Sequence, residues 1–398
     1  MSLGHGRHYL AIPGPSVIPD RVLTAMHRAS ANIYDGDLPD MVPGIIDDLK
    51  VLAGTSGNAA MYIANGHGTW EAAISNVFSR GDLALVPSTG RFAEGWALMA
   101  QHMGIKTDVM DFGNRAPIDP ARVEERLRAD KGHQIRAVMC VQVDTSTSVR
   151  NDIKALRDVL DRTGHPALLM VDCIASFGCD RFEMDAWGVD VMASASQKGL
   201  MTPPGLGFVF YNQKADGYRD TANALTHYWD WRPRTAPDEF YKYFDGTAAT
   251  HHLYGLREAL DMIAEEGRSA VFARHARLSQ AVWAAFDVWG QQGPLQLNIT
   301  NPDCRAHSVT SVHAGSDKGT ALRKWLEFKA GVTLGIGLGM ADPSDPKWHH
   351  FFRVGHMGHV NTHMVMGALG AIEAGLRAVE IPFQTGGLSA AAEVLSTA

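Results

Sequence analysis

Short apolar runs alternate with helix-like patterns through the first half of the chain. We predict buried strands where such runs occur, over residues 82–86, 137–143, 167–171, 189–193 and 206–211. Between two of these runs, Asp119 and Pro120 are typical of a helix start, and Val123 and Leu127 then lie on one helical face. Strands that alternate with amphipathic helices predict an α/β fold with a mostly parallel sheet, covered by helices on both faces.

The pattern changes near residue 269. A long helical stretch passes through Val282 and Phe286, a strand candidate covers residues 308–312, and another helix is predicted over 364–379. The chain has 398 residues, more than one hydrophobic core usually supports. We therefore divide it into an N-terminal segment (1–20), a large domain (21–268) and a small C-terminal α/β domain (269–398). The alanine-rich tail after Gln384 is expected to be loosely held.

Composition narrows the class of protein and its partners. Hydrophobic residues make up 45% and charged residues 20% of the chain, as in soluble globular proteins. The formal net charge is -7 without a basic face, so we expect no nucleic-acid partner. No stretch is long and apolar enough to span a membrane, and the first residues lack the apolar core of a secretory signal. We therefore expect a cytoplasmic protein.

The cysteines favour a reducing compartment. None of the four belongs to a CxxC pair, and two lie inside apolar, strand-like runs. We expect buried free thiols rather than disulfides, and no metal site. The four are Cys140, Cys173, Cys179 and Cys304.

Two polar residues stand at the ends of predicted strands, where an open parallel sheet binds its ligands. Asp172 directly follows the run 167–171, and a carboxylate there is well placed to face a cofactor ring. Lys198 follows the next strand among small polar residues. A lysine in that position can be desolvated and can form a Schiff base as an activated amine.

A third signal lies upstream, where Asn65, Gly66, His67 and Gly68 precede a helical pattern. Small residues at a helix start leave backbone N–H groups free for an anion such as phosphate. Each signal alone has an ordinary explanation, because a strand-end Asp is often a helix cap, most lysines are solvated and a glycine pair is often only a turn. The order of the three signals nevertheless matches what pyridoxal phosphate requires, namely an anion cradle, an acidic partner for the pyridine nitrogen and an amine.

An ordered set of motifs extends this pattern along the chain. The sequence resembles the class V pyridoxal-phosphate aminotransferases, specifically the alanine–glyoxylate and serine–glyoxylate group, over nearly its whole length. The resemblance implies a fold type I transferase, with a mostly parallel sheet of the seven-stranded type in the large domain and a smaller C-terminal α/β domain. The motifs that carry it are Ile-Pro-Gly-Pro-Ser at 12–16, Asn-Gly-His at 65–67, Val-Asp-Cys-Ile-Ala-Ser at 171–176, Gly-Val-Asp at 188–190, Ser-Gln-Lys-Gly at 196–199, Pro-Pro-Gly at 203–205, Gly-Ile-Gly-Leu-Gly at 335–339 and Phe-Arg-Val-Gly-His-Met-Gly at 352–358.

The resemblance implies catalytic and ring-binding roles. Lys198 would form the internal aldimine and then move the proton between Cα and C4′, and Asp172 would keep the pyridine nitrogen protonated. Phe92 would stack on one face of the ring and Ile174 would pack on the other. Thr145 would approach the ring hydroxyl.

The phosphate and the substrate would have separate binding groups. Backbone groups of Gly66 and His67, with Asn65 and Gln197, would hold the cofactor phosphate. The substrate would be bound by Arg353 and Gly14, and Arg353 would bind its carboxylate with a bidentate pair of hydrogen bonds. Without the family resemblance, a surface salt bridge is the ordinary role for an arginine such as Arg353.

The resemblance also implies a homodimer whose subunits share their active sites. Relatives supply a phosphate contact from a Tyr-His-x-Thr-like stretch of the partner, and Thr247 can keep that role here. Phe244 stands where the tyrosine hydroxyl is expected, and the neighbouring Tyr243 is a candidate replacement. Residues 33–37 are acidic where relatives carry a basic stretch, and the aromatic residues 227–231 are either a pocket wall or a dimer-interface patch.

The leading interpretation is a ping-pong transaminase. It moves an amino group from a small amino acid, such as alanine or serine, to a small 2-oxo acid such as glyoxylate or pyruvate. A pyridoxal-phosphate lyase on the same fold is the first alternative, although a desulfurase needs a mobile cysteine and the cysteines lie mostly in strand-like segments. A non-catalytic ligand-binding relative and a nucleotide-binding protein using residues 335–339 are the others.

Overall fold

The fold is built on two sheets, seen in a computed structural model that describes residues 2–397. The larger sheet has seven strands in the order β2-β10-β9-β8-β5-β3-β4. All neighbouring pairs are parallel except those of β10, which runs antiparallel to both β2 and β9. The strands are β2 (Asn58–Ala64), β3 (Leu83–Ser88), β4 (Lys106–Asp111), β5 (Ile135–Val141), β8 (Leu168–Asp172), β9 (Val191–Ala195) and β10 (Gly205–Tyr211).

Helices cover both faces of this sheet, because its central strands β5, β8 and β9 are buried on both sides. In β8, Leu168 and Met170 belong to one hydrophobic cluster, whereas Leu169 and Val171 belong to the other. The first cluster includes α3 (Gly66–Val77), α4 (Arg91–His102) and α7 (Gln213–Arg219). The second includes α1 (Asp20–Met26), α2 (Asp37–Ala53), α5 (Pro120–Ala129), α6 (Ile153–Thr163) and α9 (Thr250–Glu266).

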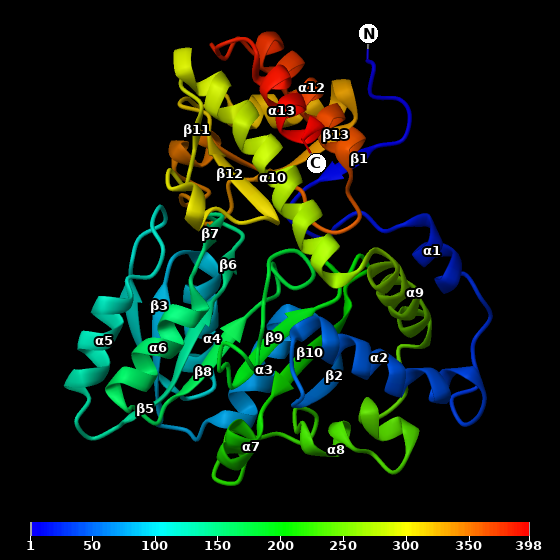
Figure 1. Ribbon diagram of the computed structural model, residues 1–398, viewed down its shortest axis with the longest axis vertical. Helices are drawn as coiled ribbons and strands as arrows, with labels where there is room; N and C mark the ends of the chain where they lie inside the picture. The colour runs from blue at the N-terminus through cyan, green and yellow to red at the C-terminus, as the bar shows by residue number, and fades with distance from the viewer. Residues whose placement is uncertain (1, 398) are drawn as a thin grey trace.

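A second, five-stranded sheet lies beside the first, in the order β1-β13-β14-β12-β11 (Figure 1). Its β1 pairs in parallel with β13 although more than 300 residues separate the two strands, so the N-terminal segment joins this sheet. The remaining strand pairs are antiparallel. The strands are β1 (Tyr9–Ala11), β11 (Gln296–Leu297), β12 (Val309–His313), β13 (Val332–Ile336) and β14 (Phe351–Gly355).

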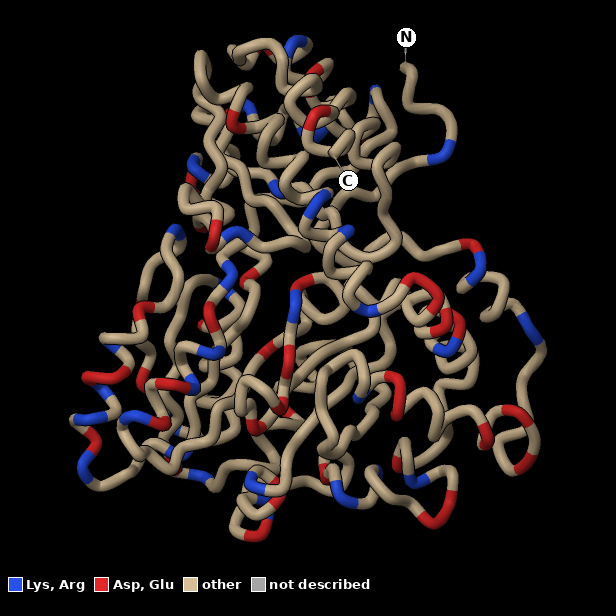
Figure 2. Tube along the Cα trace, in the orientation of Figure 1, with Lys and Arg blue, Asp and Glu red and all other residues tan. Residues whose placement is uncertain are grey.

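The second sheet has a hydrophobic core of its own, formed with helices of the C-terminal third. These helices are α10 (Arg268–Trp289), α11 (Gly319–Trp325), α12 (Thr362–Ala378) and α13 (Gly387–Ser396). The division at residues 268 and 269 stays a proposal, and the start of α10 at Arg268 together with the separate core supports it. Basic and acidic residues are interspersed through both parts of the chain (Figure 2).

The strand and helix predictions agree with this architecture in most places. All five predicted strands belong to the larger sheet, and Asp119 caps α5 by accepting a hydrogen bond from the Ala121 N–H at 2.9 Å. The prediction for the tail is wrong, because α13 packs against α10 and Ala391 is fully buried. Ala391 belongs to the core that α10 shares with the second sheet, and Leu388, Val394 and Leu395 pack against this core, which a composition argument does not reveal.

The aromatic segment 227–231 has a structural role at its last residue. Trp231 is fully buried and stacks on Tyr211, with ring centroids 4.1 Å apart and ring planes inclined by 10°. Its Nε1 donates a hydrogen bond to Asp216 at 3.0 Å. Trp231 is therefore part of the core that supports β10 and the short helix α8 (Arg232–Thr235).

We expect Trp231→Ala to lower the free energy of unfolding by about 3–5 kcal/mol, because it leaves a large cavity and removes one of the hydrogen bonds that Asp216 accepts, while the bond from Arg232 remains. Urea unfolding followed by fluorescence and circular dichroism measures the change. Trp231→Phe keeps the stacking on Tyr211 and should cost less. A Trp231→Ala protein of unchanged stability with an altered KM would instead place the side chain on a substrate pocket.

Candidate active site

The ends of β8 and β9 border a cavity of about 200 Å³. Asp172 is the last residue of β8, and Lys198 lies three residues beyond β9. The cavity therefore sits at the carboxyl edge of the parallel strands, as the topology predicts. Its lining residues come from the sheet edge, the starts of α3 and α4 and the loops that follow the strands, and they are Asn65, Gly66, His67, Trp70, Phe92, Val143, Thr145, Asp172, Ile174, Ala175, Gln197 and Lys198.

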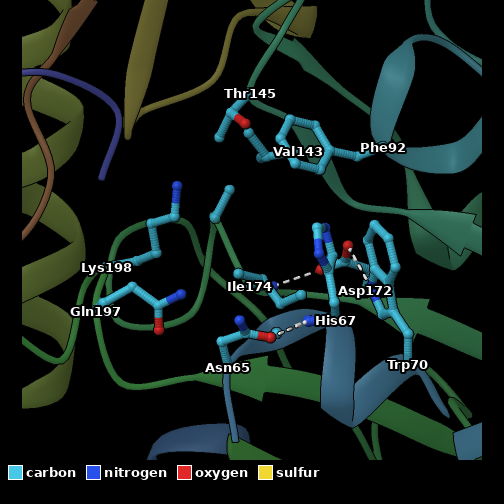
Figure 3. A pocket seen from close by; sticks show the side chains of 12 residues that line it. Asn65, His67, Trp70, Phe92, Val143, Thr145, Asp172, Ile174, Gln197 and Lys198 are labelled. Atoms are coloured by element: carbon cyan, nitrogen blue, oxygen red, sulfur yellow. Dashed lines mark hydrogen bonds between the residues drawn. The ribbon is translucent and has the colours of Figure 1, made fainter. Parts of the chain in front are cut away.

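Asp172 is held at one side of the cavity by two hydrogen bonds. Its Oδ1 accepts the Ile174 N–H at 2.6 Å, and its Oδ2 accepts the Trp70 Nε1–H at 3.0 Å (Figure 3). Burial raises the pKa of this carboxyl to about 7, although both hydrogen bonds favour the charged form. A positively charged partner in the cavity would lower this pKa again and keep the carboxylate ionised.

Trp70 is a site residue that the sequence interpretation did not identify. It lies on the first turns of α3, is almost fully buried and stacks on Trp96 with ring centroids 5.9 Å apart. Its indole orients the Asp172 carboxylate toward the cavity. The sequence signal that could have found it is its position five residues after Asn65, which places it one turn inside the helix that opens at the phosphate-type loop.

Lys198 reaches the cavity from the opposite side, so that its amine and the Asp172 carboxylate lie across the opening from one another (Figure 3). Burial, and next the charge of Arg353, lower the pKa of the amine to about 8. The Nζ donates a hydrogen bond to the Pro13 carbonyl. A lysine with a lowered pKa has a larger unprotonated fraction at neutral pH and is a better nucleophile toward an aldehyde.

Gly14 packs directly against this lysine. It has a φ of +96°, and a Cβ built there would come within 2.5 Å of the Lys198 Nζ. A side chain at position 14 would therefore displace the amine. The predicted place of Gly14 beside the reacting groups has this steric support, although Gly14 is not among the lining residues of the cavity.

The start of α3 borders the cavity at the place where the sequence predicts that the cofactor phosphate binds. Asn65 caps this helix, and its Oδ1 accepts the N–H groups of His67 at 3.1 Å and Gly68 at 3.3 Å. One of the two backbone donors predicted for phosphate is thus paired with Asn65, so a phosphate there must use Gly66 or displace the Asn65 side chain. The Gln197 Oε1 is buried without a hydrogen-bond partner among the described residues, and rotation of this amide presents its NH₂ group instead.

Phe92 and Ile174 border the cavity from different sides (Figure 3). Phe92 is fixed at the start of α4, because its N–H donates to the buried Asp144 Oδ2 at 2.9 Å. Thr145 follows Asp144 directly and lines the same opening. A planar ring placed between the two apolar side chains would have an aromatic face on one side and an aliphatic one on the other.

Arg353 lies next to Thr145, behind the residues that line the cavity. It is 6% exposed on β14, and its Nη1 donates to the Thr145 carbonyl at 2.8 Å while its Nε donates to the Ile336 carbonyl at 2.6 Å. It is not a lining residue of the cavity, but its charge lowers the pKa of the Lys198 amine. Burial lowers its own pKa to about 10, so it remains a cation at neutral pH. The surface salt bridge considered for this residue is wrong, since Arg353 is buried and bonds to carbonyl groups.

Three features that the sequence indicated as functional do not line the cavity of their own chain. Thr247 is exposed, and Tyr243 lines a different cavity beside Asp47 on α2. The acidic segment 33–37 forms an exposed turn before α2, with Tyr34 89% exposed. None of these residues contacts the groups around Lys198 within one chain.

The side chains around the cavity fit pyridoxal phosphate by their chemistry. Within residues 2–397 the buried Asp172 forms no ion pair, and a protonated pyridine nitrogen would supply one. The partly buried amine of Lys198 suits an aldehyde. The Gln197 Oε1, which has no hydrogen-bond partner within residues 2–397, lies at the same opening as the start of α3, where an anion is favoured. Phe92 and Ile174 suit the two faces of a flat ring.

Comparison with known proteins decides the family. The family model described as aminotransferase class V matches residues 50–364, which is most of the chain and includes Asp172, Lys198 and Arg353. The chain belongs to the class V aminotransferases. This family depends on pyridoxal phosphate, in agreement with the residues around the cavity.

Curated class V relatives match over nearly their whole length. A serine–glyoxylate aminotransferase of Methylorubrum extorquens is 37% identical over 93% of this chain and 91% of its own. An L-aspartate–glyoxylate aminotransferase of Paracoccus denitrificans is 34% identical over 96% of this chain and 94% of its own. A solved ureidoglycine–glyoxylate aminotransferase of Bacillus subtilis covers both chains completely with a TM-score of 0.87, and at 24% identity it shows the fold.

Two further properties of the described chain bear on its partners. Within residues 2–397, no helix combines the length and the apolar character needed to cross a membrane. In the same range, no group of three or more histidine, cysteine or acidic side chains is arranged to hold a metal ion. The four cysteines are free, and burial raises the pKa of each thiol.

We expect the cofactor-free protein to lose stability as the pH rises from about 4 to about 7, because Asp172 binds its proton more tightly when folded than when unfolded. A pKa of about 7 against an ordinary value of about 4 corresponds to at most about 4 kcal/mol at and above neutral pH. Asp172→Asn should remove this part of the pH dependence. Urea unfolding of both proteins across this pH range measures it, and identical slopes for the two would contradict the raised pKa.

Proposed function

We propose that this class V aminotransferase moves the amino group of a small amino acid, such as alanine or serine, to glyoxylate or pyruvate in a ping-pong reaction. The observation that carries the proposal is the placement of the partly buried Lys198 amine and the buried Asp172 carboxylate on opposite sides of one small cavity. The names of the relatives support glyoxylate as the acceptor, because the serine, aspartate and ureidoglycine enzymes share it while their donors differ.

The residues around the cavity would have separate roles in the reaction. Bound pyridoxal phosphate supplies an aldehyde that takes the amino group and a ring that withdraws electrons from the substrate Cα. Asp172 keeps a positive charge on the ring nitrogen, and Trp70 holds the carboxylate in place. Lys198 removes the proton from Cα of the donor and returns a proton to Cα of the acceptor, for which an amine of lowered pKa is suited.

Arg353 would orient the substrate. Two of its guanidinium nitrogens, Nε and Nη1, donate to carbonyl groups, and the remaining N–H donors can bind a carboxylate. The cavity of about 200 Å³ is smaller than most ligand sites and must also hold the cofactor ring, so it leaves little room for a large substrate. Gly14 leaves room for the Lys198 side chain beside this site.

We also propose a homodimer with shared active sites in the cytoplasm. Thr247 is exposed and does not line the cavity of its own chain, so it can reach a cofactor phosphate only in a partner subunit. Tyr243 lines a cavity with Pro43 and Asp47, which argues against its replacing the hydroxyl that Phe244 lacks. The four free thiols support a reducing compartment.

The function is tested by a half-reaction with single amino acids. Purified holoenzyme is mixed with L-alanine, L-serine, L-aspartate or taurine without an acceptor, and the absorbance of the bound cofactor is followed. We expect one stoichiometric conversion to the amine form, the release of the matching oxo product, and reversal by glyoxylate or pyruvate. Lys198→Ala should abolish the conversion. Repeated turnover without an acceptor would identify a lyase, and a protein that binds no cofactor would support a non-catalytic relative.

Arg353→Ala should raise the KM for both the amino donor and the 2-oxo acid by about tenfold or more, corresponding to about 1.4 kcal/mol or more of lost binding. Arg353→Lys keeps the charge without the fork of donors and should recover only part of the affinity. The thermal unfolding temperature of both variants shows how much the lost hydrogen bonds to Ile336 and Thr145 destabilise the protein. An unchanged KM would mean that another group binds the carboxylate.

A further inference from the structure

A buried histidine outside the cavity contacts Gly358. This glycine belongs to the segment that follows Arg353 and lies against the backbone of Lys198. His275 lies on α10, is fully buried and forms two hydrogen bonds. Its Nδ1 is 2.7 Å from the Val271 carbonyl oxygen, and its Nε2 is 3.0 Å from the Gly358 nitrogen. A carbonyl can only accept and a backbone N–H can only donate, so Nδ1 carries the proton and Nε2 accepts. The imidazole is therefore neutral, and burial lowers its pKa to about 3.

The neighbouring Arg274 binds the other side of the same peptide segment. Its Nη1 donates to the Gly358 carbonyl at 3.1 Å and to the Val360 carbonyl at 2.8 Å, while Glu266 pairs with the rest of the guanidinium. Both backbone polar groups of Gly358 are thus bound by adjacent side chains of α10.

Gly358 in turn packs against the backbone of the reactive lysine. Its φ is +77°, and a Cβ built there would lie 3.1 Å from the Lys198 carbonyl oxygen and 3.1 Å from the Ser16 Oγ. Ser16 donates a hydrogen bond to the same Lys198 carbonyl at 2.7 Å. Gly358 and Ser16 thus lie against the peptide from which the Lys198 side chain extends.

The same segment begins at the carboxylate-binding arginine. Gly358 lies five residues after Arg353, and between them His356 is anchored by two further hydrogen bonds. Its Nδ1 is 2.9 Å from the His307 carbonyl oxygen, and its Nε2 is 2.8 Å from the Thr310 hydroxyl, which accepts the Trp283 Nε1–H. The stretch from Arg353 to Gly358 is thus held at both ends, on β14 and on α10.

We propose that His275 is a positioning residue for transamination: by accepting the Gly358 N–H it fixes the distance between the Lys198 amine and the Arg353 guanidinium. The substrate carboxylate and Cα must meet these two groups at once, so a displacement of about 1 Å can cost up to about a hundredfold in rate. The inference rests on the proposed function, since it concerns the turnover of an amino acid with a carboxylate. It assigns to α10 a role in the reaction although no residue of α10 lines the cavity.

Two substitutions of His275 test separately the hydrogen bond to Val271 and the one to Gly358. The amide oxygen of His275→Gln can reach the place of Nε2 and accept the Gly358 N–H. The amide of His275→Asn reaches only the place of Nδ1, so it keeps the bond to Val271 and loses the bond to Gly358. The matched control is His165→Asn, because His165 is also buried with two hydrogen bonds, to Asp130 and Ala167, but lies before the start of β8, at the opposite end of that strand from Asp172.

The experiment measures the half-reaction rate and the KM of each holoenzyme with L-serine, or with whichever donor converts the wild type. It also measures the pH midpoint of the absorbance change of the bound cofactor, which reports the surroundings of Lys198 without turnover. We expect His275→Asn to lower the rate about tenfold or more and to shift the midpoint. His275→Gln and His165→Asn should stay within about threefold of the wild-type rate, with unshifted midpoints.

Equal losses in the two His275 variants, or an equal loss in His165→Asn, would overturn the proposal, since either result points to general destabilisation. If His275→Asn does not yield folded protein, Arg274→Met releases Gly358 from its carbonyl side and should produce the same loss of rate and shift. An Arg274→Met enzyme that behaves like the wild type would then overturn it. A wild-type enzyme that converts no amino acid would instead contradict the proposed function, and the absorbance midpoints would still test the role of His275.

Discussion

Removal of water from Asp172 and Lys198 is the constraint on which the rest of the site depends. Each group is buried at the edge of the sheet, and burial moves the two pKa values toward neutrality from opposite directions, to about 7 for the carboxyl and about 8 for the amine. Such burial is costly unless a ligand of complementary charge and reactivity completes the site. A cofactor with a basic ring nitrogen at one end and an aldehyde near the other satisfies both groups. The Trp70 indole and the Pro13 carbonyl hold the two groups in place until then.

The second sheet carries Arg353, the residue that we propose binds the substrate carboxylate. Arg353 is brought to the wall of the cavity by its bond to the Thr145 carbonyl, and β14 is held in turn by β12 and β13. The α10 helix spans the junction between the two parts of the chain. Near its start Arg268 donates to the carbonyl groups of Leu52 and Phe182, and about two turns later His275 binds Gly358. The distance between amine and guanidinium is therefore a property of the packing between the two parts, as well as of the strands that carry them.

Local patterns were sufficient for much of the fold and for the reactive groups. Alternation of apolar runs and helical faces identified five strands of the larger sheet, and the end of each run located Asp172 and Lys198. The outer strands β2 and β4 were missed. β4 carries charged and polar residues, and β2 is rich in alanine and ends directly before the loop at Asn65. The family resemblance supplied Phe92, Ile174, Thr145 and Gln197, which all line the cavity, and those roles remain proposals. Trp70 was missed because a buried tryptophan on a helix is ordinarily a core residue.

By itself the sequence determined the class of fold, the family and the order of the anion loop, the acid and the amine, because periodicity and strand ends are recorded in neighbouring residues. The tertiary structure alone decided which distant segments meet. The Pro13 carbonyl faces Lys198 across 185 positions, and Arg353 reaches Thr145 across 208. β1 joins the second sheet, β10 runs against its neighbours, and His275 meets Gly358. These contacts depend on how whole layers pack, and no local pattern encodes them, since each partner alone is an ordinary loop or core residue.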